Sequence, residues 1–297
     1  MYSRWFNVAV IVLWLTTMGW LFHEKVLPPL LVGEPPSYRT ILHAQRSNPP
    51  VGWSMSVNGR PLGWALSKTA DLPNGLTEIR SCVHFEEIPL QQMTPGWLRG
   101  ALEVIDRPRN ALEMDAHSLL IIDPLGRLSR FESRVWLDPK TALLSLQGTV
   151  EGSELELEVR SGDFLYATKA YLPRNALLGD SLSPQTQLPG LRVGQTWTVP
   201  AYSLFRPPND PMEILEATVE RIEPINYDGR PEDTLLVVYR NDPGFGIGRD
   251  RSPRGKLWVR GDGTVLKQEV TFLNSTMTFV RLSDKESYEL DLKSTIN

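Results

Sequence analysis

The sequence contains little cysteine and little histidine, and this scarcity excludes several kinds of site. One Cys and four His occur among its 297 residues. A single cysteine excludes an intrachain disulfide and a metal site made of several cysteines. The histidines, at positions 23, 43, 84 and 117, form no HxH or HxxxH pair. Because paired histidines are the usual signature of a histidine metal site, we expect no bound metal.

The chain also lacks an excess of positive charge and a nucleotide-binding pattern. Lys and Arg number 31 and Asp and Glu number 35, which gives a net charge of −4. Proteins that bind nucleic acid normally carry a basic surface that neutralises phosphates, so we expect no nucleic-acid partner. Strands and helices do not alternate as a doubly wound nucleotide fold requires, and we expect no cofactor.

One long apolar run is present near the start of the chain. Residues 5–22, WFNVAVIVLWLTTMGWLF, carry no charge. A helix of this length spans about 27 Å, close to the roughly 30 Å hydrocarbon core of a bilayer. Trp5 and Trp20 lie near its two ends, where indole rings favour the membrane interface. We therefore predict that residues 1–25 form a transmembrane anchor.

Two other interpretations of this run stay open: a cleaved signal peptide and a buried helix of a soluble protein. The segment after it, HEKVLPPLLVGEPP, has no small-x-small cleavage site. Arg4, just before the run, favours an amino terminus inside the cell. The bulk of the chain would then lie outside the cytoplasm, in the periplasm, with the membrane as a partner.

The segment after the apolar run is rich in proline. Residues 26–50 contain Pro-Pro pairs at 28–29, 35–36 and 49–50. Because proline fixes φ and interrupts regular helix, we predict a semi-rigid spacer here. The remaining residues, 51–297, form the predicted extracytoplasmic β domain, in which the loop-like segment 173–190 could mark a seam.

The β domain opens with an alternating segment and a strong turn signal. An apolar residue occupies every second position from 51 to 57, which indicates a half-buried strand. Asn58-Gly59 follows, and this dipeptide is the strongest two-residue hairpin signal. Such a turn pairs residues whose numbers sum to 117, so Trp53 should face Trp64. Pro61 donates no backbone N–H and should place its strand at a sheet edge or cause a bulge.

A second turn signal extends this register to a third strand. If Asn74-Gly75 is also a two-residue turn, Trp64 faces Phe85. Trp53, Trp64 and Phe85 would then form one aromatic row on one face of the sheet. We predict these three residues as the apolar ligand-binding site, with ordinary core packing as the alternative.

The rest of the chain repeats the strand pattern. Alternating segments joined by short turns predict about fifteen strands, the last three at 265–273, 276–282 and 286–292. Thr94-Pro95 begins the one clear helix of the domain, which extends to Ile105. The predicted fold is therefore mainly β: a curved antiparallel sheet, half-barrel or sandwich-like, with one short helix and the N-terminal transmembrane helix.

Few residues are placed for chemistry. Cys82 and His84 would share one strand face, as would Asp115 and His117. Side chains two residues apart in a strand lie about 6.5–7 Å apart, too far for a direct hydrogen bond. The carboxylates at 86, 87, 103 and 106 have no spacing that fixes a catalytic pair. We therefore predict no catalytic residue and expect that the protein is not an enzyme.

Three segments together resemble bacterial envelope proteins with the lipoprotein-carrier type of fold. They are VGWSMSVNGRPLGWAL (51–66), GLRVGQTWTVP (190–200) and GKLWVRGDGTVLKQEVTF (255–272). The resemblance implies a strongly curved antiparallel half-barrel that binds acyl chains in its concavity, or a non-enzymatic envelope factor. The chain departs from the carrier pattern by keeping a membrane anchor and by having few helices to cover the concave side.

The sequence thus predicts a membrane-anchored, non-enzymatic extracytoplasmic β protein that binds an apolar ligand, a lipid or lipoprotein, in a curved sheet. Two alternatives stay open. One is an envelope scaffold or accessory subunit that binds protein partners only. The other is a hydrolase whose carboxylates the sequence does not identify.

Overall fold

A computed structural model of the chain describes eleven segments of it. They are residues 4–27, 35–45, 49–86, 113–138, 141–162, 164–172, 177–180, 183–202, 212–242, 252–272 and 275–296. The helix predicted at 94–105 lies outside the described residues.

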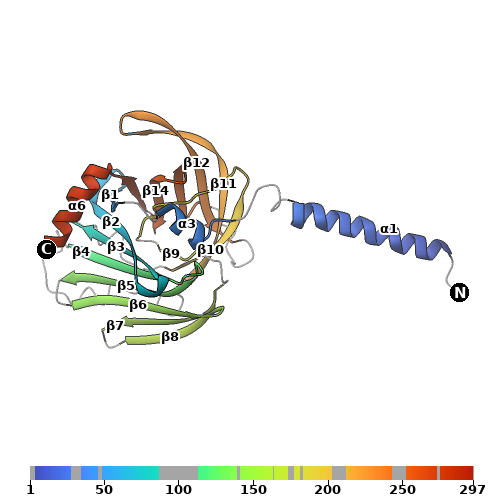
Figure 1. The fold of residues 1–297 in the computed structure, drawn as a ribbon, viewed down its shortest axis with the longest axis horizontal. Helices are drawn as coiled ribbons and strands as arrows, with labels where there is room; N and C mark the ends of the chain where they lie inside the picture. Colours follow the sequence, from blue (N-terminus) through green and yellow to red (C-terminus); the bar gives the residue numbers. More distant parts are fainter. Residues whose placement is uncertain are drawn as a thin grey trace.

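The described residues contain a single sheet of fifteen strands, and three α-helices accompany it (Figure 1). The first eight strands are β1 (Val51–Val57), β2 (Arg60–Asp71), β3 (Thr77–Phe85), β4 (Met114–Ile122), β5 (Leu128–Asp138), β6 (Thr141–Glu151), β7 (Glu154–Ser161) and β8 (Phe164–Tyr171). The others are β9 (Gly179–Asp180), β10 (Thr196–Tyr202), β11 (Met212–Tyr227), β12 (Arg230–Asn241), β13 (Gly255–Arg260), β14 (Val265–Phe272) and β15 (Ser275–Arg281). Neighbouring strands pair antiparallel, except that β9 pairs parallel with β10. The predicted antiparallel fold is confirmed.

The order of the strands explains why the sheet is curved. From β1 the chain proceeds strand by strand to the edge β8, reappears at the opposite edge as β9, and returns to β15, which pairs with β1. Fifteen flat strands would put β8 and β9 about 67 Å apart at about 4.8 Å per strand. The eight Cα–Cα steps from Tyr171 to Gly179 reach about 28 Å at most. The sheet must therefore curl until its two edges approach each other, although within the described part they do not pair.

The concave face of the sheet contains the main hydrophobic core. Trp53, Phe85, Phe131, Tyr202 and Phe279 are its largest fully buried aromatic residues. They come from strands far apart in the sheet, so the core is the filled interior of the curl. The prediction that alternate residues of β1 are buried is confirmed, since every second residue from 51 to 57 lies in this core.

Helix α3 (Tyr38–Gln45) belongs to this core, although the sequence places it in the spacer. Tyr38, Ile41 and Leu42 are buried there. Figure 1 shows α3 within the opening of the curled sheet. The proline pairs at 35–36 and 49–50 flank the helix and do not interrupt it, so part of the segment 26–50 contributes to the fold.

Helix α6 (Asp284–Ile296) lies on the opposite, convex face. For residues 286–292 of this helix the sequence analysis predicts a strand. That prediction is wrong. Ser283 and Glu286 form a capping box: Ser283 N–H donates to Glu286 Oε2 (3.0 Å), and Glu286 N–H donates to Ser283 Oγ (3.3 Å). The helix packs on β1, where Gly52 N–H donates to Ser287 Oγ (2.9 Å).

Helix α1 (Arg4–Leu21) projects away from the β body, and the apolar side chains along it are exposed (Figure 1). The segment Trp5–Glu24 is long enough and apolar enough to cross a membrane. A signal sequence near an amino terminus has the same properties. The structure therefore agrees with the predicted helix, and both a membrane anchor and a signal sequence fit it.

Candidate functional site

The three predicted ligand-binding residues do not share a face. Trp53 and Phe85 are fully buried in the concave core, but Trp64 lies on the convex face. The first hairpin begins with the predicted register, since Val57 pairs with Arg60. A bulge at Leu62 then shifts the register by one residue, and Trp53 faces Ala65. One inserted residue moves every later side chain to the other face, so the predicted row is wrong for Trp64.

The second hairpin differs from its prediction for a similar reason. Its connection runs from Leu72 to Leu76 and includes a short 3₁₀ turn at Pro73–Gly75. Asp71 pairs with Thr77, so Trp64 faces His84 and not Phe85. The rings of Trp64 and His84 stack on the convex face with their centroids 5.4 Å apart.

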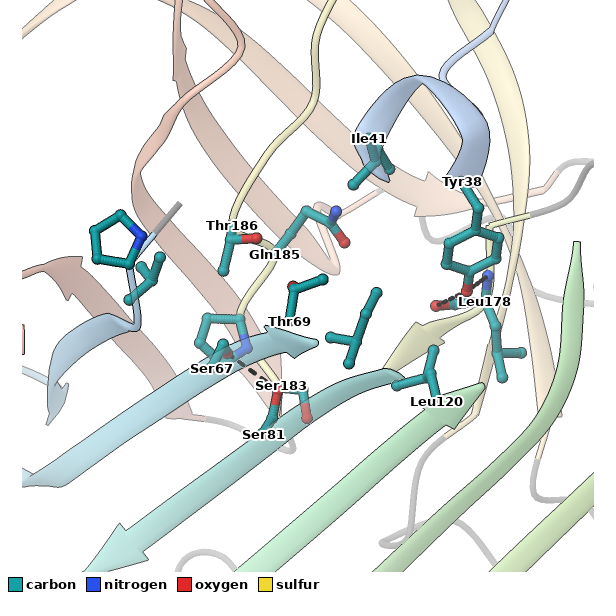
Figure 2. Close-up of a pocket in the computed structure, with 14 residues that line it drawn as sticks. Tyr38, Ile41, Ser67, Thr69, Ser81, Leu120, Leu178, Ser183, Gln185 and Thr186 are labelled. Atoms are coloured by element: carbon teal, nitrogen blue, oxygen red, sulfur yellow. Dashed lines mark hydrogen bonds between the residues drawn. The ribbon is translucent and has the colours of Figure 1, made fainter. Parts of the chain in front are cut away.

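The hollow that the described residues form on the concave side is small. Between α3 and strands β2 to β4 lies a cavity of about 70 Å³ (Figure 2). It is partly polar, because Ser67 and Ser81 line it and contact each other (Oγ–Oγ 3.0 Å). On its other side Leu178 N–H donates to the Tyr38 hydroxyl (2.9 Å). This volume is far below the roughly 300–1,000 Å³ of small-molecule sites, so the cavity does not fit an acyl chain.

A row of serines makes this part of the interior polar. Ser67, Ser81, Ser118 and Ser133 are buried and lie directly opposite one another across β2, β3, β4 and β5. Ser118 and Ser133 form a second hydroxyl pair at 3.1 Å. Buried hydroxyls must keep hydrogen-bond partners, so an apolar chain inserted here would gain little.

A larger hollow of about 490 Å³ lies on the convex face, and we call it the outer groove. It crosses strands β2 to β5, and the C-terminal part of α6 borders it. Apolar atoms make up most of its lining surface. The lining residues are Leu66, Lys68, Arg80, Ser81, Cys82, His117, Ser118, Leu119, Glu132, Arg134, Trp136 and Ser294. This volume falls within the range of about 300–1,000 Å³ that is usual for small-molecule sites.

The floor of the outer groove is uncharged at neutral pH. Burial, and to a lesser extent the nearby Asp115 carboxylate, raise the pKa of Cys82 to about 11. Burial also lowers the pKa of His117 below its ordinary value, although Asp115 opposes this shift. His117 contacts the edge of the Trp136 ring, with centroids 4.8 Å apart. A protonated thiol and a neutral imidazole are both uncharged, so this part of the surface is only weakly polar.

The cations around the outer groove are each engaged by a carboxylate. Lys68 pairs with Asp291 of α6. Arg80 pairs with Glu78, and Arg134 pairs with Glu132. Each of these three cations thus has a carboxylate partner, which weakens its attraction for an anionic ligand.

The residue pairs considered for catalysis, Cys82 with His84 and Asp115 with His117, have other partners in the structure. His84 Nδ1 is 2.8 Å from Asp115 Oδ1, and the two residues face each other across β3 and β4. Cys82 faces His117 across the same strands. The thiol is protonated because its pKa is raised, so it has no activation as a nucleophile. Within the described segments no cluster of three or more His, Cys, Asp or Glu could hold a metal ion.

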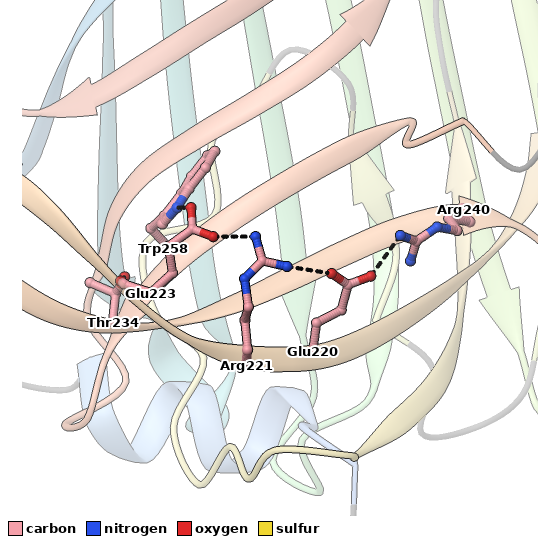
Figure 3. Close-up of polar contacts among 6 residues, drawn as sticks. All are labelled: Glu220, Arg221, Glu223, Thr234, Arg240 and Trp258. Atoms are coloured by element: carbon pink, nitrogen blue, oxygen red, sulfur yellow. Dashed lines mark hydrogen bonds and ion pairs between the residues drawn. The ribbon is translucent and has the colours of Figure 1, made fainter.

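A second polar cluster lies on strands β11 to β13 and is closed by its own contacts (Figure 3). Arg240 pairs with Glu220 (2.6 Å), and Arg221 bridges Glu220 and Glu223. The indole N–H of Trp258 donates to Glu223 Oε1 (2.9 Å). We infer that this cluster fixes the long β11–β12 hairpin to β13.

The sequence analysis missed the outer groove, although one signal was present. Leu66, Leu119 and Trp136 are large apolar residues at positions that the register places on the convex face. Such residues indicate a covered or ligand-binding surface. To recognise them, one would need the register of four strands and the position of α6.

No known family model matches the sequence, and no curated protein matches it. The solved structures that match the chain include the following two. A β-barrel-like protein of the domain of unknown function DUF1849 from Brucella abortus has a TM-score of 0.48 and 8% identity, covering 79% of this chain and 95% of its own. A DUF1089 family protein from Pseudomonas aeruginosa has a TM-score of 0.34 and 15% identity, covering 70% of this chain and 90% of its own. Both belong to families of unknown function, and the resemblance to lipoprotein carriers is not shown.

Proposed function

We propose that this chain is a membrane-anchored, non-enzymatic periplasmic protein that binds an apolar ligand, the acyl chain of a lipid or lipoprotein, in the outer groove. The observation that carries this proposal is the contrast between the two hollows. The outer groove measures about 490 Å³, whereas the interior cavity measures about 70 Å³. We therefore assign the ligand site to the convex face, whereas the sequence analysis predicts it on the concave face.

The chemistry of the outer groove supports an apolar occupant. Leu66, Leu119 and Trp136 supply its apolar contacts, and Cys82 and His117 are neutral. Binding an apolar chain to such a surface removes apolar area from water without burying an unpaired charge.

A fluorescent fatty acid, cis-parinaric acid, tests the ligand half of the proposal. Leu119→Gln places an amide on the floor of the groove and should weaken binding about tenfold or more. Ile121→Gln is the matched control, because Ile121 lies two residues away on the same half-buried face but outside the groove. Equal loss in both variants, or no fluorescence change with the unmodified chain, would overturn the proposed site.

Flotation of the full chain with phospholipid vesicles tests the membrane half. We expect the chain to float with vesicles and to resist extraction at alkaline pH, because α1 is apolar and exposed. The mass of the mature protein isolated from cells distinguishes the alternative. A mature chain that lacks α1 would show that this helix is a cleaved signal.

A further inference from the structure

Strand β8 is one edge of the sheet, and within the described part of the chain it pairs with β7 only. Leu172 N–H donates to Ser153 O (3.0 Å), and Leu155 faces Ala170. In an antiparallel ladder the bonded side alternates along a strand. The even-numbered residues of β8 therefore bond to β7. The odd-numbered residues Leu165, Ala167, Lys169 and Tyr171 direct their N–H and C=O groups to the free edge.

Among the described residues, this edge lacks the usual protection against another strand. Edge strands are commonly protected by a charged side chain, often lysine. Lys169 is the one charged residue of β8, but its Nζ lies 2.5 Å from Glu154 Oε1 and 2.7 Å from Glu156 Oε1. Both carboxylates belong to β7, so the charge is turned away from the free edge. Leu165 and Tyr171 are 55% and 75% exposed.

We propose that β8 pairs antiparallel with β8 of a second copy of this chain, with the two-fold axis through Thr168. In this register Leu165 lies opposite Tyr171 of the other copy, and Ala167 lies opposite Lys169. Every residue that directs its backbone to the free edge then has a partner. In a register shifted by two residues, Tyr171 or Leu165 would lie opposite a residue outside β8.

The side chains agree with the same register on both faces. On the convex face it joins the two exposed apolar residues, Leu165 and Tyr171. On the concave face Phe164 lies opposite Leu172, and Tyr166 lies opposite Ala170. Aromatic–aliphatic pairs across strands stabilise a sheet, and each Lys169 keeps its two carboxylates. This match of the strand with itself favours a second copy over an unrelated partner, because an isologous contact needs one self-complementary surface.

The contact of one strand with another is small beside the roughly 1,600 Å² of a standard interface, so the pairing is weak in solution. Attachment of both copies to one membrane raises their effective concentration. This step alone depends on the proposed anchor. The register depends only on β8.

Disulfide formation between full chains reconstituted in phospholipid vesicles tests the register. In a Cys82→Ser background, Thr168→Cys places two thiols on the axis. Thr168 forms a non-hydrogen-bonded pair with its copy, for which Cα atoms lie about 4.5 Å apart, within disulfide reach. We expect a disulfide-linked dimer under mild oxidation. Ala170→Cys is the matched control on the same face, because its copy lies opposite Tyr166 and is out of reach.

Ala167→Pro, added to the Thr168→Cys chain, tests the backbone contact. It removes an N–H that points to the free edge and leaves the β7 bonds in place, so the dimer should disappear at unchanged thermal stability. If this variant unfolds, Leu165→Asp serves the same purpose at an exposed position.

The outcomes separate the two proposals. Equal cross-linking at 168 and 170, no dimer at 168 in chains that float with the vesicles, or cross-linking to other proteins only would overturn the second-copy pairing. Loss of vesicle flotation, in contrast, would overturn the anchor alone.

Discussion

Phe131 of β5 stacks on Tyr202 of β10 with the ring centroids 4.8 Å apart, although nine strands lie between β5 and β10 in the sheet. Both side chains are fully buried. Since no ladder joins these two strands, the contact crosses the concave side and joins opposite walls of the curl. Aromatic rings thus occupy the space that a carrier of acyl chains would keep open.

Phe131→Ala should destabilise the protein strongly. Removal of a buried phenylalanine leaves a cavity and costs about 3–5 kcal/mol. Chemical denaturation of the full chain measures the change. Phe164→Ala is the control, because Phe164 is 49% exposed on β8 and its loss should cost only about 1 kcal/mol. Similar losses for both variants would contradict the assignment of Phe131 to the core.

Gly148→Ala should also destabilise the fold, through the same ring. A Cβ at this position would lie 2.1 Å from Phe131 Cε1, on the facing strand. Overpacking of this kind costs about 1–3 kcal/mol. Gly261→Ala is the control, because no atom lies within 4 Å of its added Cβ. In a Phe131→Ala background the cost of Gly148→Ala should fall, and additive effects would show that the two residues are not coupled.

The sequence was sufficient for the fold class and insufficient for the faces of individual residues. Alternation at 51–57 and the Asn58-Gly59 turn predict the first hairpin and its starting register. The inserted residue Leu62 then moves Trp64 to the other face. The sequence rule for Pro61 allows an edge strand or a bulge, and the structure has a bulge beside it. A rule that permits two outcomes cannot fix the face of the residues that follow in β2.

The helices illustrate a different limit. Ser283 and Glu286 have the spacing of a capping box, so α6 was predictable from local residues. Helix α3 was not, because its eight residues are too short to be stable alone and depend on burial of Tyr38 and Ile41 in the core. The outer groove depends on both levels, since it needs the register of β2 to β5 and the docking of α6.

Trp258→Phe should change how stability depends on pH. The hydrogen bond from the Trp258 indole N–H holds the pKa of Glu223 below its ordinary value, and Arg221 has a smaller effect in the same direction. A carboxylate whose folded-state pKa is lowered stabilises the fold fully above its unfolded pKa of about 4.3 and loses this contribution as pH falls through the folded value. The difference in free energy of unfolding between the unmodified chain and Trp258→Phe should therefore be larger at pH 6 than at pH 3.

Trp197→Phe provides the control for this pH effect. The Trp197 indole N–H is buried and has no hydrogen-bond partner among the described residues. The cost of its replacement should be the same at pH 6 and pH 3, because no carboxylate titration is linked to it. A pH-independent cost for Trp258→Phe as well would show that its bond to Glu223 does not contribute in solution.

The Cys82 thiol gives a direct measurement of the outer groove. Burial, and then Asp115, raise its pKa to about 11, compared with about 8.5 for a free cysteine. At neutral pH its thiolate fraction is therefore lower by about two orders of magnitude. Alkylation by iodoacetamide should be roughly tenfold to a hundredfold slower, because a thiolate of higher pKa is also the stronger nucleophile. The rate should rise about tenfold per pH unit up to pH 11, whereas the chain unfolded in guanidinium should level off near pH 8.5.

Since Cys82 lines the groove, saturating cis-parinaric acid should slow the reaction further in the unmodified chain but much less in Leu119→Gln. A folded chain that levels off near pH 8.5 would show that the thiol is open to water and that the groove is not the apolar surface described above.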